Sequence, residues 1–197
     1  GSRRVYRKCC GKNAPPPPAS IAAYAHRLDN ALVRRILPLA HEVKDEDADP
    51  LADFPIDEFE AREMVDLFAI WTAFHWDAGG RTLAEWFLER HGGAATEEER
   101  AWIAAQFAAW FGVWSVRDVQ PGAGLALEDL LTAEHRFVHE VRGSEGVRPG
   151  MLLLARVVDW QGISLLAGMH NQPLPPMMET NLLAALRAGR ELGPPTA

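Results

Sequence analysis

Cys9 and Cys10 are adjacent, and they are the only cysteines in the chain. A disulfide between neighbouring residues is strained, because its two Cα atoms must lie farther apart than one trans peptide comfortably allows. Two neighbouring thiolates are better suited to form half of a zinc site, which takes four ligands in a closed tetrahedron. The sequence therefore predicts a metal-binding head in which these two cysteines supply half of the ligands.

The cysteines lie in a basic segment ahead of an acidic body. The first twelve residues contain no acid and five bases, which are Arg3, Arg4, Arg7, Lys8 and Lys12. The rest of the chain holds 15 basic and 27 acidic side chains, so its formal charge is −12 and that of the whole chain is −7. Because an acidic body repels a phosphate backbone, we expect nucleic-acid contact through the basic head alone.

The segment GSRRVYRKCCG, residues 1–11, resembles the second half of the SEC-C motif. This motif is a small zinc-binding module found at the C-terminus of the protein-translocation ATPase SecA and in many other bacterial proteins. Tyr6 stands at the aromatic position of the motif, and Cys9 and Cys10 stand at its second ligand pair. The first pair, Cys-x-Cys, would precede Gly1, so zinc is expected only together with that missing upstream cysteine pair.

The resemblance also implies what the head binds. It assigns contact with a partner to the basic residues and the aromatic residue, here Arg3, Arg4, Tyr6, Arg7 and Lys8. The partner implied is a protein surface, with a chaperone or the ribosome as examples. We therefore expect a bacterial SEC-C motif-containing protein that acts as a non-enzymatic, zinc-dependent adaptor.

Histidines support a rival hypothesis, in which the protein is a hydrolase with a site between its helical and β parts. His75 lies near Asp77 in FHWD, and His170 follows an expected strand, so either imidazole is a candidate general base. His135 and His139 are four residues apart and share one face of an expected strand. No third metal ligand accompanies that pair at a recognisable spacing, and surface histidines of an edge strand explain it more simply.

A third hypothesis makes the β-domain a nucleic-acid-binding surface. It requires Arg136, Arg142, Arg148 and Arg156 to lie on one face, together with exposed aromatic side chains. The chain has no Gly-x-Ser-x-Gly sequence, no Walker loop, no dinucleotide-binding fingerprint and no His-Glu-x-x-His motif. The enzyme classes that carry those motifs therefore receive no support.

Hydrophobic spacing indicates helices in the first half of the chain. After the partial motif at 1–13, the polyproline linker 14–19 precedes a helical domain at 20–111, in which apolar residues recur at helical spacing. Thr82 and Thr96 each stand three residues before a glutamate, which is the capping box that starts a helix. The aromatic residues of this part are expected to form the core of a helical bundle.

The period changes after residue 111. Short apolar runs separated by Gly or Pro turns predict strands at 112–173, and a last helix with a loose tail is expected at 174–197. The expected fold class is α+β: an N-terminal zinc-knuckle remnant, a helical bundle, then a small antiparallel β-barrel or bent sheet with a C-terminal helix. Because no apolar run has the length of a membrane helix and no secretory signal is present, we expect a cytoplasmic protein without membrane contact.

Overall fold

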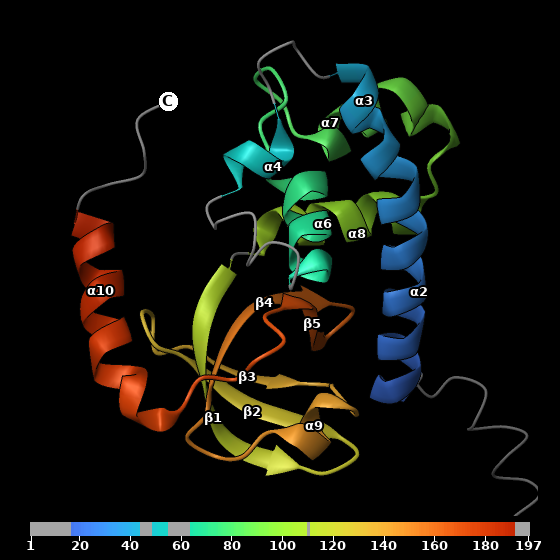
Figure 1. The fold of residues 1–197 in the computed structure, drawn as a ribbon. Coiled ribbons are helices and arrows are strands. Elements are labelled where there is room, and N and C mark those ends of the chain that lie inside the picture. The colour runs from blue at the N-terminus through green and yellow to red at the C-terminus, as the bar shows by residue number, and fades with distance from the viewer. Residues whose placement is uncertain (1–16, 44–48, 55–63, 110, 192–197) are drawn as a thin grey trace, which may run out of the picture.

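The structure is a computed structural model, and it describes residues 17–43, 49–54, 64–109 and 111–191. Within these residues a group of helices lies above a β-barrel, and a last helix stands beside the barrel (Figure 1). The expected α+β class, with helices first, then a small β-barrel and a C-terminal helix, is confirmed. The zinc-knuckle remnant predicted at 1–13 lies outside the described residues.

The helical part combines longer helices with short helical turns. In chain order they are α2 (Pro18–Ile36), η1 (Leu37–Leu39), α3 (Ala40–Val43), α4 (Pro50–Asp53), α6 (Val65–Phe74), α7 (Leu83–His91), η2 (Gly92–Ala94) and α8 (Glu97–Ala108). Both predicted capping boxes are present. The hydroxyls of Thr82 and Thr96 accept hydrogen bonds from the backbone N–H groups three residues on, and the glutamates there accept from the threonine N–H groups. These bonds fix where α7 and α8 begin.

Five strands form a closed barrel below these helices. They are β1 (Phe111–Gln120), β2 (Gly124–Asp129), β3 (His135–Val138), β4 (Leu152–Trp160) and β5 (Ile163–Met169), in the spatial order β1-β2-β3-β5-β4. Four pairings are antiparallel, and β3 meets β5 as a parallel pair at Val138 and Ser164. The parallel contact arises because a connection containing α9 (Gly143–Gly146) separates β3 from the β4–β5 hairpin. Of the two alternatives that the sequence left open, barrel and bent sheet, the structure has the barrel.

The helices and the barrel share one hydrophobic core. Trp76, Phe87 and Trp102 of the helical part belong to the same buried cluster as Trp160 of β4. The ring centroids of Trp102 and Trp160 are 5.2 Å apart in an edge-to-face arrangement, which favours the contact of two aromatic rings. A second cluster fills the barrel around Trp114. The shared cluster holds the helices against β4 and β5, so side chains of both parts meet along this junction.

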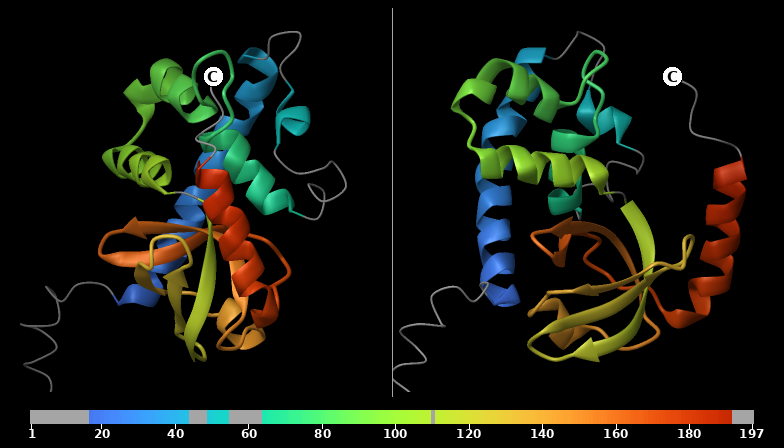
Figure 2. Two further views of the ribbon diagram at one scale, coloured as in Figure 1. Left: turned by 90° about the vertical axis from the view of Figure 1, so that its left-hand side faces the viewer. Right: turned by 180° about the vertical axis from the view of Figure 1, so that it is seen from behind.

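The last helix, α10 (Glu179–Glu191), follows the short η3 (Pro176–Met178) and stands at the side of the barrel (Figure 2). Leu182 and Leu183 pack there against a small apolar cluster that includes Val113 and Leu152 of the barrel strands. Among the helices in the described part of the chain, none is both long and apolar enough to cross a bilayer.

Candidate functional site

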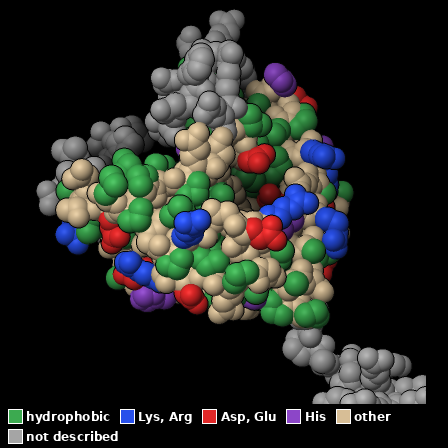
Figure 3. Space-filling view, turned by 60° about the horizontal axis from the view of Figure 1, so that its bottom comes forward, with side chains coloured by type: hydrophobic (Ala, Val, Ile, Leu, Met, Phe, Trp, Pro, Cys, Tyr) green, Lys and Arg blue, Asp and Glu red, His purple; other side chains and the backbone are tan. Residues whose placement is uncertain are grey.

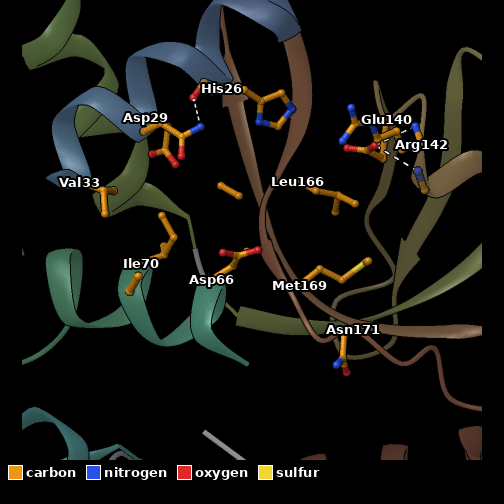
Figure 4. A pocket seen from close by; sticks show the side chains of 15 residues that line it. His26, Asp29, Val33, Asp66, Ile70, Glu140, Arg142, Leu166, Met169 and Asn171 are labelled. Carbon is orange, nitrogen blue, oxygen red and sulfur yellow. Dashed lines mark hydrogen bonds between the residues drawn. The ribbon is translucent and has the colours of Figure 1, made fainter. Parts of the chain in front are cut away.

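A cleft opens between the helices and the barrel (Figure 4). Its volume is about 510 Å³, and its walls come from α2, α6, β5 and the segment that joins β3 to α9. Val33, Ile70 and Leu166 supply part of an apolar wall, while charged side chains from several elements line the same space. A cleft of this size, with an apolar wall and a few polar groups, is typical of a small-molecule site.

Gly168 brings α6 close to β5 at this cleft. Its φ of +93° lies in the left-handed region, which side chains other than glycine rarely adopt. A Cβ atom at this position would also lie 3.1 Å from Cδ1 of Leu67 on α6. The close approach of the two elements therefore depends on glycine.

Asp29 of α2 is held in the cleft by two donors from α8. Its Oδ1 accepts hydrogen bonds from Trp102 Nε1 at 2.9 Å and from Gln106 Nε2 at 2.8 Å. No donor among the described residues contacts its Oδ2. One carboxylate oxygen is therefore fixed by the protein, and the other is available to a ligand.

A buried arginine supports this arrangement from the barrel. Arg156 of β4 is 1% exposed, and its guanidinium donates to Gln106 Oε1 at 2.9 Å. It also donates to the carbonyl oxygens of Gln106 and Ala109, at 2.7 and 3.3 Å, where α8 ends. A cation at this end of a helix compensates the carbonyl groups that have no helical partner. The amide of Gln106 thus links the arginine of the barrel to Asp29 in the cleft.

Burial acts on the charge at both ends of this network. The pKa of the Asp29 carboxyl lies above its ordinary value, because burial raises it by more than the two hydrogen bonds and the charges of His26 and Arg156 lower it. Burial also lowers the pKa of Arg156 to about 10, and the charge of Asp29 opposes that shift. Since a group with a pKa of about 10 keeps its proton at neutral pH, Arg156 is charged there.

Four further charged or titratable side chains line the cleft, from α2, α6 and the β3–α9 segment. Glu140 Oε1 accepts the backbone N–H groups of Arg142 at 3.0 Å and of Gly143 at 3.1 Å (Figure 4). Asp66 lies on α6 and His26 on α2. Within the described ranges, the side chains of Asp66 and Arg142 have neither a hydrogen bond nor an ion pair. The lining therefore holds three carboxylates against one arginine.

The site predicted at the N-terminal head cannot be compared with this cleft. Its metal ligands and partner-binding residues all lie outside the described residues: Cys9, Cys10, Arg3, Arg4, Tyr6, Arg7 and Lys8. In the part of the chain that the structure describes, no group of three or more His, Cys, Asp or Glu side chains could hold a metal ion.

The two histidines predicted as general bases lie away from the lining of this cleft. His75 follows α6, and partial burial of the ring together with the nearby Arg156 charge lowers its pKa to about 4. No hydrogen bond joins His75 to Asp77 among the described residues; the Asp77 carboxylate accepts instead from the N–H of Gly80 at 2.5 Å. His170 Nδ1 accepts the backbone N–H of Gln172 at 3.1 Å, so a local turn engages it.

The second histidine pair does not converge on one site. The His135 side chain is 71% exposed, and its Nε2 lies 3.9 Å from a carboxylate oxygen of Glu128. His139 follows the end of β3. Its ring packs edge-on against that of Phe137, with the two ring centroids 5.0 Å apart. Each histidine has its own neighbour.

The four arginines named for a nucleic-acid surface have different surroundings. Arg156 is buried, and Arg136 forms ion pairs with Glu134 and Asp159. Arg142 lines the cleft, and Arg148 is exposed. Figure 3 shows arginine side chains standing among acidic and apolar ones on the face that it presents. Arg156 is thus removed from any surface that a nucleic acid could contact.

The sequence predicted no site role for Asp29, Asp66, Glu140 or His26, and it indicated Arg142 and Arg156 only for a nucleic-acid surface. Asp29 and the Arg156 that supports it nevertheless carry a signal in the sequence. Asp29 stands four residues after Ala25 and four before Val33, both buried on the inner face of α2. Arg156 interrupts the apolar run MLLLARVVDW. A charged residue inside an apolar pattern indicates a buried group that needs partners.

Comparison with known proteins corrects the interpretation of the head. A search of the curated proteins and a search of the solved structures returned no match. The scan of protein families found no SEC-C family, so the resemblance suggested by eleven residues at the N-terminus is wrong. It found instead a family of unknown function (DUF7986), whose model matches residues 55–188 and thus covers α6, the barrel and most of α10. Since this match spans more than half of the chain, the protein belongs to the DUF7986 family.

Proposed function

We propose that the protein binds, in the cleft between helices and barrel, a small molecule that carries a positively charged amine. The observation that carries this proposal is the Asp29 carboxylate, whose Oδ1 is held by two donors of α8 while its Oδ2 has no donor among the described residues. A carboxylate fixed in this way accepts a charge-assisted hydrogen bond from an ammonium group without having to reorganise.

The charges of the lining support a cation over an anion. Glu140 already accepts two backbone N–H groups, so Asp29 and Asp66 are the carboxylates left for a ligand. A phosphate or carboxylate ligand would be attracted by Arg142 and, where its ring carries a proton, by His26, and it would be repelled by three acids. An ammonium group has the opposite balance.

Calorimetric titration with methylammonium and n-butylammonium tests this proposal, with methanol and n-butanol as uncharged probes of similar shape. We expect the ammonium ions to bind and the alcohols not to bind. Asp66→Asn should weaken amine binding about tenfold or more, because it removes a charged acceptor. Asp118→Asn is the matched control, since Asp118 is an exposed carboxylate of β1 that does not line the cleft. Equal binding of amines and alcohols, or no binding of either, would contradict the proposal.

His26 favours hydrolysis as a second candidate function. It lines the cleft three residues before Asp29 on the same helix. A histidine close to a carboxylate is suited to take a proton from water. This candidate keeps the predicted place of the site, between the helical and β parts, and replaces His75 and His170 by His26.

Turnover of chromogenic esters and amides with an amine side chain tests this second candidate. His26→Gln is expected to abolish turnover while n-butylammonium still binds. A wild-type protein that binds amines and hydrolyses none of these compounds would leave binding as the function and remove hydrolysis.

The partners of the predicted adaptor were assigned from the resemblance to the SEC-C motif, and because that resemblance is wrong, nothing now supports those partners. A non-enzymatic role agrees with the binding of a small amine. Zinc binding at Cys9 and Cys10 and the joining of two protein partners stay predictions, because their residues lie outside the described part of the chain.

A further inference from the structure

A second cavity adjoins the cleft along α2. Its volume is about 740 Å³, and it lies between the first two turns of α2 and the barrel segments around residues 122–123 and 139–142. Three residues line both cavities, namely His26, Glu140 and Arg142. The two spaces therefore adjoin at these side chains, and together they are called the groove between α2 and the barrel.

The two ends of this groove differ in chemistry. The end near α6 carries Asp29 and Asp66. The end near the start of α2 is lined by the small apolar residues Ala19, Ala22 and Ala23, and His139 is the polar side chain that lines this end and not the first cavity. Val141, from the barrel side, lines the apolar end and is 48% exposed. An exposed valine facing small side chains leaves apolar surface that an apolar group would remove from water.

We infer that the ligand is amphipathic, with an ammonium head at Asp29 and Asp66 and an alkyl tail that runs along α2 toward Ala19. This inference rests on the proposed amine binding and adds the class of the amine. The tail is the occupant assigned to the apolar end, because that end adjoins the place of the head at His26, Glu140 and Arg142. From Asp29, which holds the head, to Ala19 the helix rises about 15 Å, which matches an extended alkyl chain of roughly twelve carbons.

The affinities of a homologous series of amines measure the contribution of the apolar end. Calorimetric titration of the full chain with n-alkylammonium ions, from methyl to tetradecyl, is expected to give an affinity that rises up to about fourfold per methylene. The rise should stop at about twelve carbons, where the tail reaches the end of the groove. n-Alkyl sulfates of the same lengths separate a general affinity for alkyl chains from binding that needs the ammonium head.

A variant that fills the groove provides the structural test. Ala23→Trp places a large ring in the apolar end, and it should remove the dependence on chain length while methylammonium binds as before. Ala31→Trp is the matched control, because Ala31 is exposed on the same helix and lines neither cavity. This control should keep the full dependence on chain length.

The outcomes separate this inference from the proposal on which it rests. If methylammonium does not bind, amine binding itself is wrong. If methylammonium binds but octylammonium binds no more tightly, or if Ala23→Trp keeps the dependence on chain length, the amphipathic ligand is wrong and amine binding stands. If the dependence appears only after residues 1–16 are deleted, the apolar end belongs to a segment of the chain itself and the inference is again overturned.

Discussion

Arg156→Met tests how strongly the buried network joins the helices to the barrel. The substitution removes three hydrogen bonds, to Gln106 Oε1 and to two carbonyl oxygens at the end of α8. Each buried polar group that loses its partner costs about 1–3 kcal/mol. Part of this loss is returned, because the guanidinium no longer has to be taken out of water and its Nε has no partner among the described residues.

The net effect is expected to be a loss of about 3 kcal/mol in the free energy of unfolding, the lower end for breaking a buried charged interaction. For a chain of this size that corresponds to a decrease of about 6–12 °C in Tm. Urea denaturation measures the free energy, and the midpoint should fall while the slope with denaturant stays the same. Arg148→Met is the control, since Arg148 is exposed and its loss should change the free energy by less than about 0.5 kcal/mol.

A double substitution shows whether the loss comes from the network. If Arg156 and Gln106 stabilise the fold through each other, Arg156→Met and Gln106→Met together should cost about 1 kcal/mol less than the two single losses added. Strict additivity would show that the two residues act separately. Equal stability of Arg156→Met and Arg148→Met would refute the view that the network holds the junction.

Three further predictions concern single positions. The fold lowers the pKa of His75 from its ordinary value of 6.5 to about 4. Between these two pH values the unfolded chain binds a proton that the native one does not. The contribution of His75 to the free energy of unfolding is therefore fully present above pH 6.5 and is lost as the pH falls toward 4. His75→Gln should flatten this part of a plot of unfolding free energy against pH, and an unchanged slope would contradict the assignment. Gly168→Ala should cost about 1–2 kcal/mol in urea denaturation because of its positive φ, and an unchanged midpoint would count against that cost. Thr96→Ala should lose about 1 kcal/mol with the N-cap of α8, whereas Thr96→Ser should keep most of the stability; equal losses would mean that the hydroxyl bond does not matter.

Features encoded by residues close in the sequence were predicted, and features that depend on distant residues were not. The capping boxes at Thr82 and Thr96 were predicted because each needs only residues three positions apart. The sequence did not decide between a barrel and a bent sheet, because closure depends on one pairing between Val138 and Ser164, and no local pattern predicts that pairing.

The site was missed for the same reason. Asp29 receives its hydrogen bonds from residues 73 and 77 positions farther along the chain, and no spacing rule joins them. The histidines were predicted as candidates because imidazole can act as an acid, a base or a metal ligand. In the structure His170 accepts a hydrogen bond from the backbone two residues on, and His135 is exposed. The head was misassigned because eleven residues are too few to identify a family when half of the expected ligands are missing.

The position of Gln106 explains how the fold maintains a charged site at the edge of its core. Its side-chain amide has one donor end and one acceptor end, and the donor contacts Asp29 while the acceptor contacts Arg156. The two charges therefore fix the orientation of the amide, and the amide in turn fixes Oδ1 of Asp29. The cost of burying Arg156 is offset by the carbonyl oxygens at the end of α8, which need a donor in any case. Because these contacts come from α2, α8 and β4, a ligand at Asp29 would bind to the same residues that join the helices to the barrel, and its binding should stabilise that junction.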